Sequence, residues 1–142
     1  MRTSNAEATW QGGLKNGKGH FRAESGAFEA GYSFGTRFGE TKGSNPEELI
    51  AAAHAACFSM ALAAGLEQAG TPATRIATRA ACTVDKVGDG FRITTMWLVT
   101  RGQVPGIDQA AFQKAAEGAR DGCPVSNALR NNVKLELDAA LE

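Results

Sequence analysis

The sequence predicts an α+β fold in which an antiparallel sheet surrounds a long buried helix. Three features support this prediction. Short strand-like runs separated by Gly-rich turns come first, a long apolar helix follows, and two strands, two helices and a last strand complete the chain. The 142 residues are the size of one ordinary domain, so a single domain over 1–142 is expected.

Residues 5–44 are predicted to be β structure. Short runs at Ala6–Gln11 and His20–Ala23 are separated by turn-forming segments such as GGLKNGKG. Gly accounts for 17 of the 142 residues, above the usual share of about 7%, which is consistent with many turns.

The strongest helix signal follows this region. Asn45 suits the N-cap, Pro46 suits the first helical position, and Glu48 comes three residues after Asn45, as in a capping box. The helix should run to about Ala69 and end at Gly70.

Within this helix, Leu49–Leu66 is about as long as a membrane span of ~18–20 residues. The segment is rich in Ala, contains His54 and Ser59, and has no basic or aromatic belt. We therefore interpret it as a helix buried inside a soluble protein, and we expect no membrane association. Its small side chains would let another backbone approach closely.

Two β runs follow at 74–86 and 90–101, joined by the hairpin sequence VGDG. In the second run, alternate residues share one face: Phe91, Ile93, Thr95, Trp97 and Val99. Residues 108–121 then predict an amphipathic helix capped by Asp108. Cys123 and Pro124 open a short helix to about Leu129, and alternation over 133–137 predicts a last strand.

Composition argues against several classes of protein. The chain has 15 Lys and Arg against 15 Asp and Glu, whereas nucleic-acid-binding proteins usually have a basic excess. Its 3 Cys are an odd number, which argues against a secreted disulfide framework. The first residues lack the apolar stretch of a signal peptide, so we expect a cytoplasmic protein. From the balanced charge we expect that it does not bind nucleic acid.

The cysteines are the first candidates for chemistry. Cys57 lies mid-helix on a stripe of small and apolar residues, and spacing alone favours a small packed side chain. Cys123 starts a helix, and the positive N-terminus of a helix stabilises a thiolate. Two interpretations of Cys123 therefore stay open, a turn residue and a reactive thiol. Cys82 lies between apolar neighbours in a β run, and we interpret it as packing.

His54 lies one helical turn before Cys57, so the two side chains can approach each other. A Cys–His nucleophile pair or a metal site is conceivable, but the CxxC spacing of zinc sites is absent. A buried, hydrogen-bonded histidine is favoured, and no metal or cofactor is expected. Glu47 is explained by the helix dipole alone, and Arg37 by a surface position.

Two long segments are distinctive: NPEELIAAAHAACFSMAL at 45–62 and GCPVSNAL at 122–129. They resemble the signature segments of the OsmC/Ohr family, which comprises osmotically inducible protein C and the organic hydroperoxide resistance protein. The resemblance extends over essentially the whole chain, through the hairpin at Trp10, the TRF and VPGID segments and the final strand. The CPVS form and the Arg of TRF resemble the OsmC branch more than the Ohr branch.

The resemblance implies a thiol peroxidase that reduces organic hydroperoxides, in an intertwined homodimer with sheets wrapped around paired central helices. Cys57 matches the peroxidatic cysteine of the family and Cys123 the resolving cysteine. Arg37 and Glu47 match the Arg and Glu that organise the thiolate, whereas Cys82 lies outside the pattern. The family also implies an intramolecular disulfide that a small dithiol or a lipoylated protein reduces.

These residue types suit the reaction. An unperturbed Cys pKa of about 8.5 leaves only a few per cent of the thiolate nucleophile at neutral pH, so full ionisation gains about tenfold. An Arg that stabilises the leaving alkoxide can supply about 10²–10³. Arg37 is expected to lower the pKa of Cys57 and to donate to the peroxide, and Glu47 to orient Arg37. Apolar surroundings would favour alkyl or lipid peroxides over hydrogen peroxide.

The spacing of Glu47 and Cys57 bears on assembly. Ten residues apart in one helix, they are about 15 Å apart along its axis. If the helix is continuous, they do not share a site within one chain. Our hypothesis is that Glu47, with Arg37, reaches the Cys57 of the partner chain, so that each site is built from both protomers.

Three alternatives remain. A non-catalytic domain could bind an apolar ligand in the same dimer cavity, and a thiol sensor could use the same disulfide as a signal. A metal-site protein could use His54, Cys57 and Cys123 as ligands. Turnover with a dithiol separates an enzyme from a sensor, and metal analysis tests the third alternative.

Overall fold

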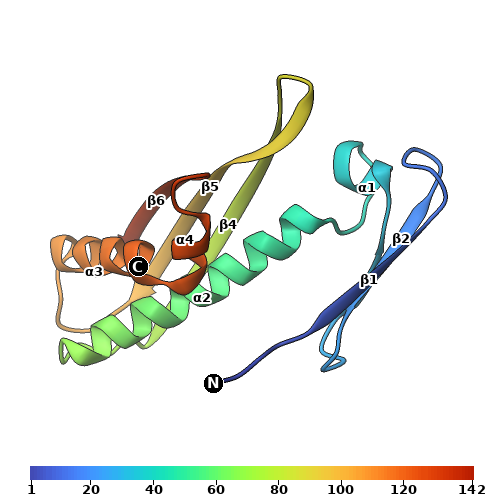
Figure 1. The fold of residues 1–142 in the computed structure, drawn as a ribbon. Coiled ribbons are helices and arrows are strands. Elements are labelled where there is room, and N and C mark those ends of the chain that lie inside the picture. The colour runs from blue at the N-terminus through green and yellow to red at the C-terminus, as the bar shows by residue number, and fades with distance from the viewer. The chain divides into compact units, whose positions relative to one another are not determined.

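The computed structural model describes residues 1–142 and divides into two compact units, Met1–Leu49 and Ile50–Glu142. The α+β class is confirmed, with strands and helices interspersed along the chain (Figure 1). The single antiparallel sheet is wrong, because the strands form two separate three-stranded sheets. The single domain over 1–142 stays a prediction.

The first unit contains an antiparallel sheet of strands β1 (Ala6–Gln11), β2 (Lys18–Ala23) and β3 (Glu29–Tyr32), in that order. The rings of Trp10 and Tyr32 come together at its end, with centroids 5.4 Å apart. Gly19 lies beneath them, and a Cβ at this position would come within 2.5 Å of the Tyr32 ring. The close packing of the two rings therefore requires glycine here.

Helix α1 (Phe34–Phe38) corrects the prediction that all of 5–44 is β structure. Its start is fixed by a capping box. The Ser33 hydroxyl accepts from the Thr36 backbone N–H, and the Thr36 hydroxyl accepts from the Ser33 N–H at 2.9 Å. These reciprocal bonds satisfy N–H groups that a short helix would otherwise leave free. Arg37 is thereby held on a helix.

Helix α2 (Pro46–Gln68) is one helix of 23 residues, as the capping signals predict. The Asn45 side chain accepts from the Glu48 backbone N–H at 2.8 Å, which confirms the N-cap. The chain leaves the helix just before Gly70, whose φ of +80° is readily adopted only by glycine.

The second unit contains the other sheet, in the order β4 (Arg75–Val87), β5 (Gly90–Gln103) and β6 (Lys134–Leu141). The predicted hairpin of β4 and β5 is confirmed, but β6 pairs with β5 in parallel. The parallel direction follows because helices α3 (Gln109–Gly122) and α4 (Pro124–Leu129) form a crossover between the two strands.

The core of this unit lies between the sheet and helices α2 and α3. It joins Phe58, Leu62 and Leu66 of α2 to the sheet and to α3, whose Phe112 is fully buried. Along β5 the buried side chains are Met96, Leu98 and Thr100. Trp97, on the opposite face, is exposed. A register shift between Thr83 and Val84 interrupts the predicted alternation, so Phe91 does not share the face of Trp97.

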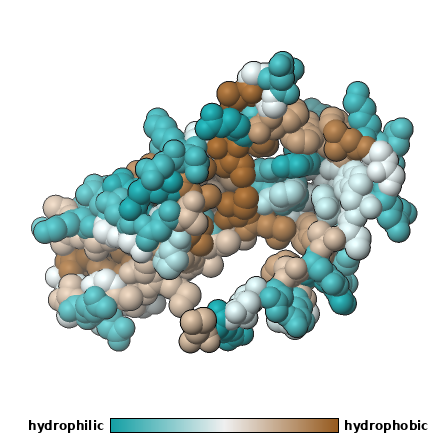
Figure 2. All heavy atoms as spheres, in the orientation of Figure 1, coloured by the Kyte–Doolittle hydropathy of each residue, from teal (hydrophilic) through white to brown (hydrophobic).

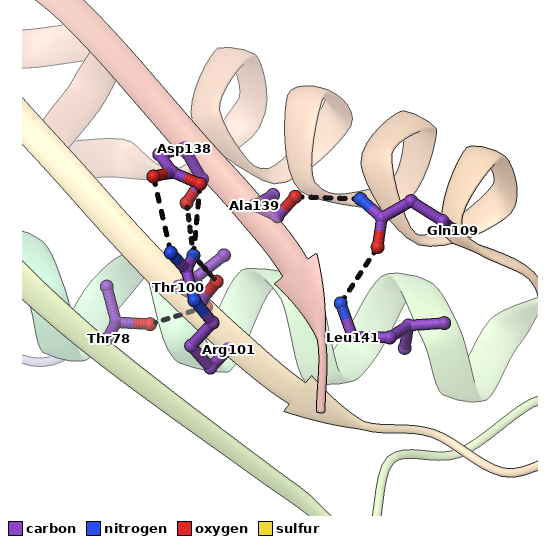
Figure 3. A network of polar contacts seen from close by, with 7 residues as sticks. All are labelled: Thr78, Thr100, Arg101, Gln109, Asp138, Ala139 and Leu141. Atoms are coloured by element: carbon purple, nitrogen blue, oxygen red, sulfur yellow. Dashed lines mark hydrogen bonds and ion pairs between the residues drawn. The ribbon is translucent and has the colours of Figure 1, made fainter.

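Polar contacts hold the edge of this sheet (Figure 3). The Gln109 amide at the start of α3 donates to the Ala139 carbonyl at 2.8 Å and accepts from the Leu141 N–H at 2.9 Å. It therefore satisfies β6 backbone groups as a neighbouring strand would. Arg101 of β5 forms an ion pair with Asp138 of β6 at 3.0 Å.

Helix α2 is less buried in the single chain than the sequence predicts. Only 22% of its most apolar window is buried, and by length and composition alone the helix could cross a membrane. The side of the helix that contains Phe58 packs on the core. The other side is exposed and consists of small or apolar residues: Ala52, Ala53, Ala56, Met60, Ala63 and Ala64. Figure 2 shows hydrophobic residues reaching the surface on the face drawn.

Candidate active site

Two thiols from distant parts of the chain meet in the second unit. Cys57 lies half-buried in the middle of α2, and Cys123 lies fully buried between α3 and α4. Both are free thiols, and they lie close enough for Cys123 to affect the pKa of Cys57. Burial raises the pKa of Cys57, a hydrogen bond with the Val125 backbone lowers it, and Cys123 raises it; the net direction is upward.

Cys123 is the N-cap of α4, as its position before Pro124 predicts. Its sulfur accepts from the Ser126 backbone N–H at 3.3 Å, and its S–H donates to the Ser126 hydroxyl at 3.1 Å. The same hydroxyl lies 2.7 Å from Nε2 of His54. His54 is therefore the buried, hydrogen-bonded histidine that the sequence favours, and its observed partner is Ser126 instead of Cys57.

Arg37 and Glu47 form a bidentate ion pair in the first unit. The Glu47 carboxylate accepts from Nε of Arg37 at 3.2 Å and from its terminal nitrogen at 2.7 Å. Glu47 is 5% exposed, whereas the Arg37 side chain is 37% exposed, so the guanidinium is held from one side and reaches solvent on another. The carboxylate fixes the orientation of the cation.

An aromatic pocket adjoins this cation. A cavity of about 320 Å³ is lined by Arg37, Leu14 and the rings of Trp10, Tyr32, Phe34 and Phe38. The guanidinium carbon of Arg37 lies 5.0 Å from the centre of the Phe38 ring, within cation–π range. The pocket thus combines one positive charge with apolar walls, a combination suited to a ligand that has a polar head and an apolar tail.

Comparison with known proteins places the chain. Residues 39–138 match the family described as OsmC-like protein. Peroxiredoxin OsmC of Escherichia coli strain K12 is 48% identical over 131 residues, which cover 92% of each chain. The chain belongs to the OsmC family. Organic hydroperoxide resistance protein OhrB of Bacillus subtilis is 31% identical over 136 residues, covering 94% of this chain and 95% of that one.

Solved structures agree with this membership. An organic hydroperoxide resistance protein OsmC from Legionella pneumophila superposes with a TM-score of 0.80 at 25% identity, covering 99% of this chain and 98% of that one. An organic hydroperoxide resistance protein from Elizabethkingia anophelis gives a TM-score of 0.80 at 28% identity, covering 100% of this chain and 98% of that one. The resemblance to the OsmC/Ohr family is thereby confirmed.

In this OsmC-family chain the four predicted site residues form two pairs, Cys57 with Cys123 and Arg37 with Glu47. Helix α2 is continuous from Glu47 to Cys57, so these two residues are about 15 Å apart along its axis. Cys82 lies in β4 and is partly exposed. No group of three or more His, Cys, Asp or Glu side chains is arranged to hold a metal ion.

Sequence reasoning missed Ser126. Its signal is local, because it occupies the third position after the Cys123 cap, where a backbone N–H faces the capping side chain. Its contact with His54 spans 72 residues of sequence and has no local signal.

Proposed function

We propose that this OsmC-family peroxidase reduces organic hydroperoxides to alcohols with Cys57 as nucleophile and Cys123 as resolving thiol. The observation that carries the proposal is the proximity of Cys57 in α2 to Cys123 at the cap of α4, two free thiols close enough for one to affect the pKa of the other. Relatives named Peroxiredoxin OsmC and organic hydroperoxide resistance protein support the peroxidase class and the hydroperoxide substrate.

The proposed chemistry has two steps. The Cys57 thiolate attacks the terminal oxygen of the hydroperoxide, the O–O bond breaks, and the alkoxide leaves and takes up a proton, giving an alcohol and a Cys57 sulfenic acid. Cys123 then attacks the sulfenic sulfur, and the S–O bond breaks. The products are an intramolecular disulfide and water. A dithiol, or a lipoylated protein, returns both thiols by exchange.

Arg37 and Glu47 are proposed to stabilise charge during the first step. A guanidinium fixed by a carboxylate can hold the thiolate and donate to the leaving alkoxide, an effect worth about 10²–10³ in rate. The aromatic pocket beside Arg37 would take the alkyl part of the substrate, which favours organic hydroperoxides over hydrogen peroxide.

The complete site is proposed to need a homodimer. The pKa of Cys57 is raised, which is opposite to what a reactive thiolate needs, so a positive charge has to be supplied. Glu47 is about 15 Å from Cys57 along α2, and we assign that charge to Arg37 of a second copy. The open face of α2, where Met60 is 75% exposed, supports a close partner helix.

A thiol count tests the proposed function. The reduced protein, freed of reductant, receives one equivalent of cumene hydroperoxide, and free thiols are titrated under denaturing conditions. We expect a fall from three thiols to one, with Cys57 and Cys123 joined in a peptide map. The Cys82→Ser variant is the control and should fall from two to none. A count that stays at three refutes the proposal and favours the ligand-binding alternative.

A further inference from the structure

His54, Ser126 and Cys123 form a buried line of hydrogen bonds to which the two proposed steps assign no role. The Cys123 S–H donates to the Ser126 hydroxyl at 3.1 Å, and that hydroxyl lies 2.7 Å from Nε2 of His54. All three side chains have an exposed fraction of 0%. The line therefore begins at the thiol that resolves the sulfenic acid and ends at a basic nitrogen shielded from water.

The direction of these bonds follows from the number of protons available. The Ser126 oxygen accepts the Cys123 proton, so its own single proton is free to point at Nε2 of His54. This arrangement requires Nε2 to be unprotonated and the ring proton to sit on Nδ1, which has no hydrogen-bond partner. Burial lowers the pKa of His54, which keeps the ring neutral at neutral pH.

The second step of the proposed reaction needs such an acceptor. Cys123 attacks as a thiolate, so its proton must leave before or during the attack. The thiol is fully buried, and water therefore has no direct access to the proton. The Ser126 hydroxyl is the group that accepts the hydrogen bond from this thiol, and its onward contact is the His54 ring.

We propose that Ser126 and His54 form a proton relay that activates Cys123 for disulfide formation. This inference rests on the proposed function, since it describes the resolving step of that reaction. Ser126 touches the reacting sulfur, whereas His54 acts through Ser126 and is a positioning residue. As Cys123 loses its proton to the Ser126 oxygen, the hydroxyl proton passes to Nε2 of His54.

The step balances. The Cys123 electron pair forms the S–S bond to Cys57, and the S–O bond breaks with its electron pair on the leaving hydroxide. That hydroxide takes up one proton and becomes water. The proton lost by Cys123 resides on His54 until it returns to solvent, so one proton is released and one is consumed. Cys57 is reduced from the sulfenic to the disulfide level as Cys123 is oxidised to it.

The surroundings of His54 bear on its pH response. Ser126 is its hydrogen-bond partner, and burial is the cause of its pKa shift. The titratable groups on the same line of contacts are the thiols of Cys123 and Cys57, and no charged side chain is bonded to the ring. Protonation of His54 therefore removes the acceptor, and the relay is lost as the pH falls below the lowered pKa of this ring.

Single-turnover kinetics on the full-length protein test the relay. Reduced protein is mixed with one equivalent of cumene hydroperoxide and quenched at intervals, with dimedone to trap the sulfenic acid and iodoacetamide to count thiols. In Ser126→Ala we expect sulfenic acid to form on Cys57 at the wild-type rate and the disulfide to form about 10–100-fold more slowly. His54→Gln should behave similarly, and Ser126→Thr, which keeps the hydroxyl, should recover most of the rate.

The pH profile separates a relay from a purely structural role. In the wild type the disulfide step should be flat near neutral pH and slow on acidification. Without the relay it should rise by about tenfold per pH unit, because only spontaneously ionised Cys123 then reacts. Ser59→Ala is the control, since it removes a part-buried hydroxyl that donates to Thr78 at 2.8 Å and has no contact with the relay.

Each outcome decides. Unchanged disulfide rates and pH profiles in Ser126→Ala and His54→Gln overturn the relay while the proposed function stands. If Ser126→Ala does not fold, His54→Gln and the wild-type profile carry the decision. If the wild type forms no sulfenic acid on Cys57, the proposed function fails and the relay fails with it.

Discussion

A site built from two chains makes a quantitative prediction for mixed dimers. One protein carries Glu47→Ala, which leaves Cys57 intact but removes the carboxylate bonded twice to Arg37. The other carries Cys57→Ser, which removes the nucleophile but keeps the Arg37–Glu47 pair. Each variant alone is expected to be nearly inactive. The two are unfolded together, refolded and assayed as a mixture.

The expected recovery follows from dimer symmetry. Random pairing of equal amounts makes about half of the dimers mixed, and each mixed dimer contains two composite sites. If Cys57 is served by the partner's Glu47, one of these two sites is complete and the other lacks both groups. The mixture should therefore regain about a quarter of the wild-type activity per chain. If both groups act within one chain, neither site is complete and no activity returns.

The distance along α2 underlies this expectation. A rise of 1.5 Å per residue over ten residues gives about 15 Å, well beyond hydrogen-bonding distance between the two side chains. The assay is consumption of cumene hydroperoxide with dithiothreitol as reductant. Arg37→Ala with Cys57→Ser is a second pairing that should complement, and Cys57→Ser with Cys123→Ser tests the resolving thiol separately. A mixture that stays at the sum of its inactive components refutes the two-chain site.

Three further predictions concern stability and assembly. Gly102→Ala should lower the free energy of unfolding by about 1–3 kcal/mol in urea, because its Cβ would lie 2.5 Å from the buried Phe112 ring, whereas Gly118→Ala has open space and should not destabilise. Burial holds the pKa of His54 in the folded state below its unfolded value of 6.5, so on acidification the unfolded state binds the proton first. The free energy of unfolding should therefore be constant in this respect above about pH 6.5 and fall below it by up to about 1.4 kcal/mol per pH unit. His54→Gln should lack this dependence. Met60→Glu should weaken dimerisation in sedimentation equilibrium by more than about tenfold while circular dichroism shows α2 intact, and an unchanged dimer constant would exclude this helix face as the interface.

The elements that the sequence predicts well are those with local signals. Asn45, Pro46 and Gly70 mark the ends of α2, and the structure places the helix between them. Asp108 marks the start of α3 in the same way. Each signal acts within a few residues, so the surrounding fold does not change it.

The features that the sequence does not predict depend on distant parts of the chain or belong to elements too short to show a pattern. The parallel direction of β6 is set by the path of the crossover, which alternation within the strand does not specify. The helix that carries Arg37 has a local signal in the Ser33–Thr36 capping box, but it spans only five residues and lies among β runs. The Ser126–His54 contact joins two segments whose local patterns say nothing of each other.

The candidate site shows the same division. Spacing alone favours packing for Cys57 and leaves Cys123 open, and only the family resemblance joins them. The structure then adds a physical reason, because the half-buried Cys57 and the buried Cys123 lie close enough for one to affect the pKa of the other. Arg37 and Glu47, each explained singly by ordinary surface and dipole effects, become informative only as a bidentate pair with a buried carboxylate.

On the two-chain proposal, assembly and thiol reactivity are one property. Within a single chain, burial and Cys123 hold the pKa of Cys57 above its ordinary value, so at neutral pH this thiol stays protonated and reacts slowly with peroxide. Pairing along α2 would bring the fixed guanidinium of Arg37 to that thiol and shift it toward the thiolate. A dissociated chain would therefore be a poor peroxidase with an intact fold. The activity per chain should then fall on dilution in step with the dimer population, with no change in the helical content of the protein.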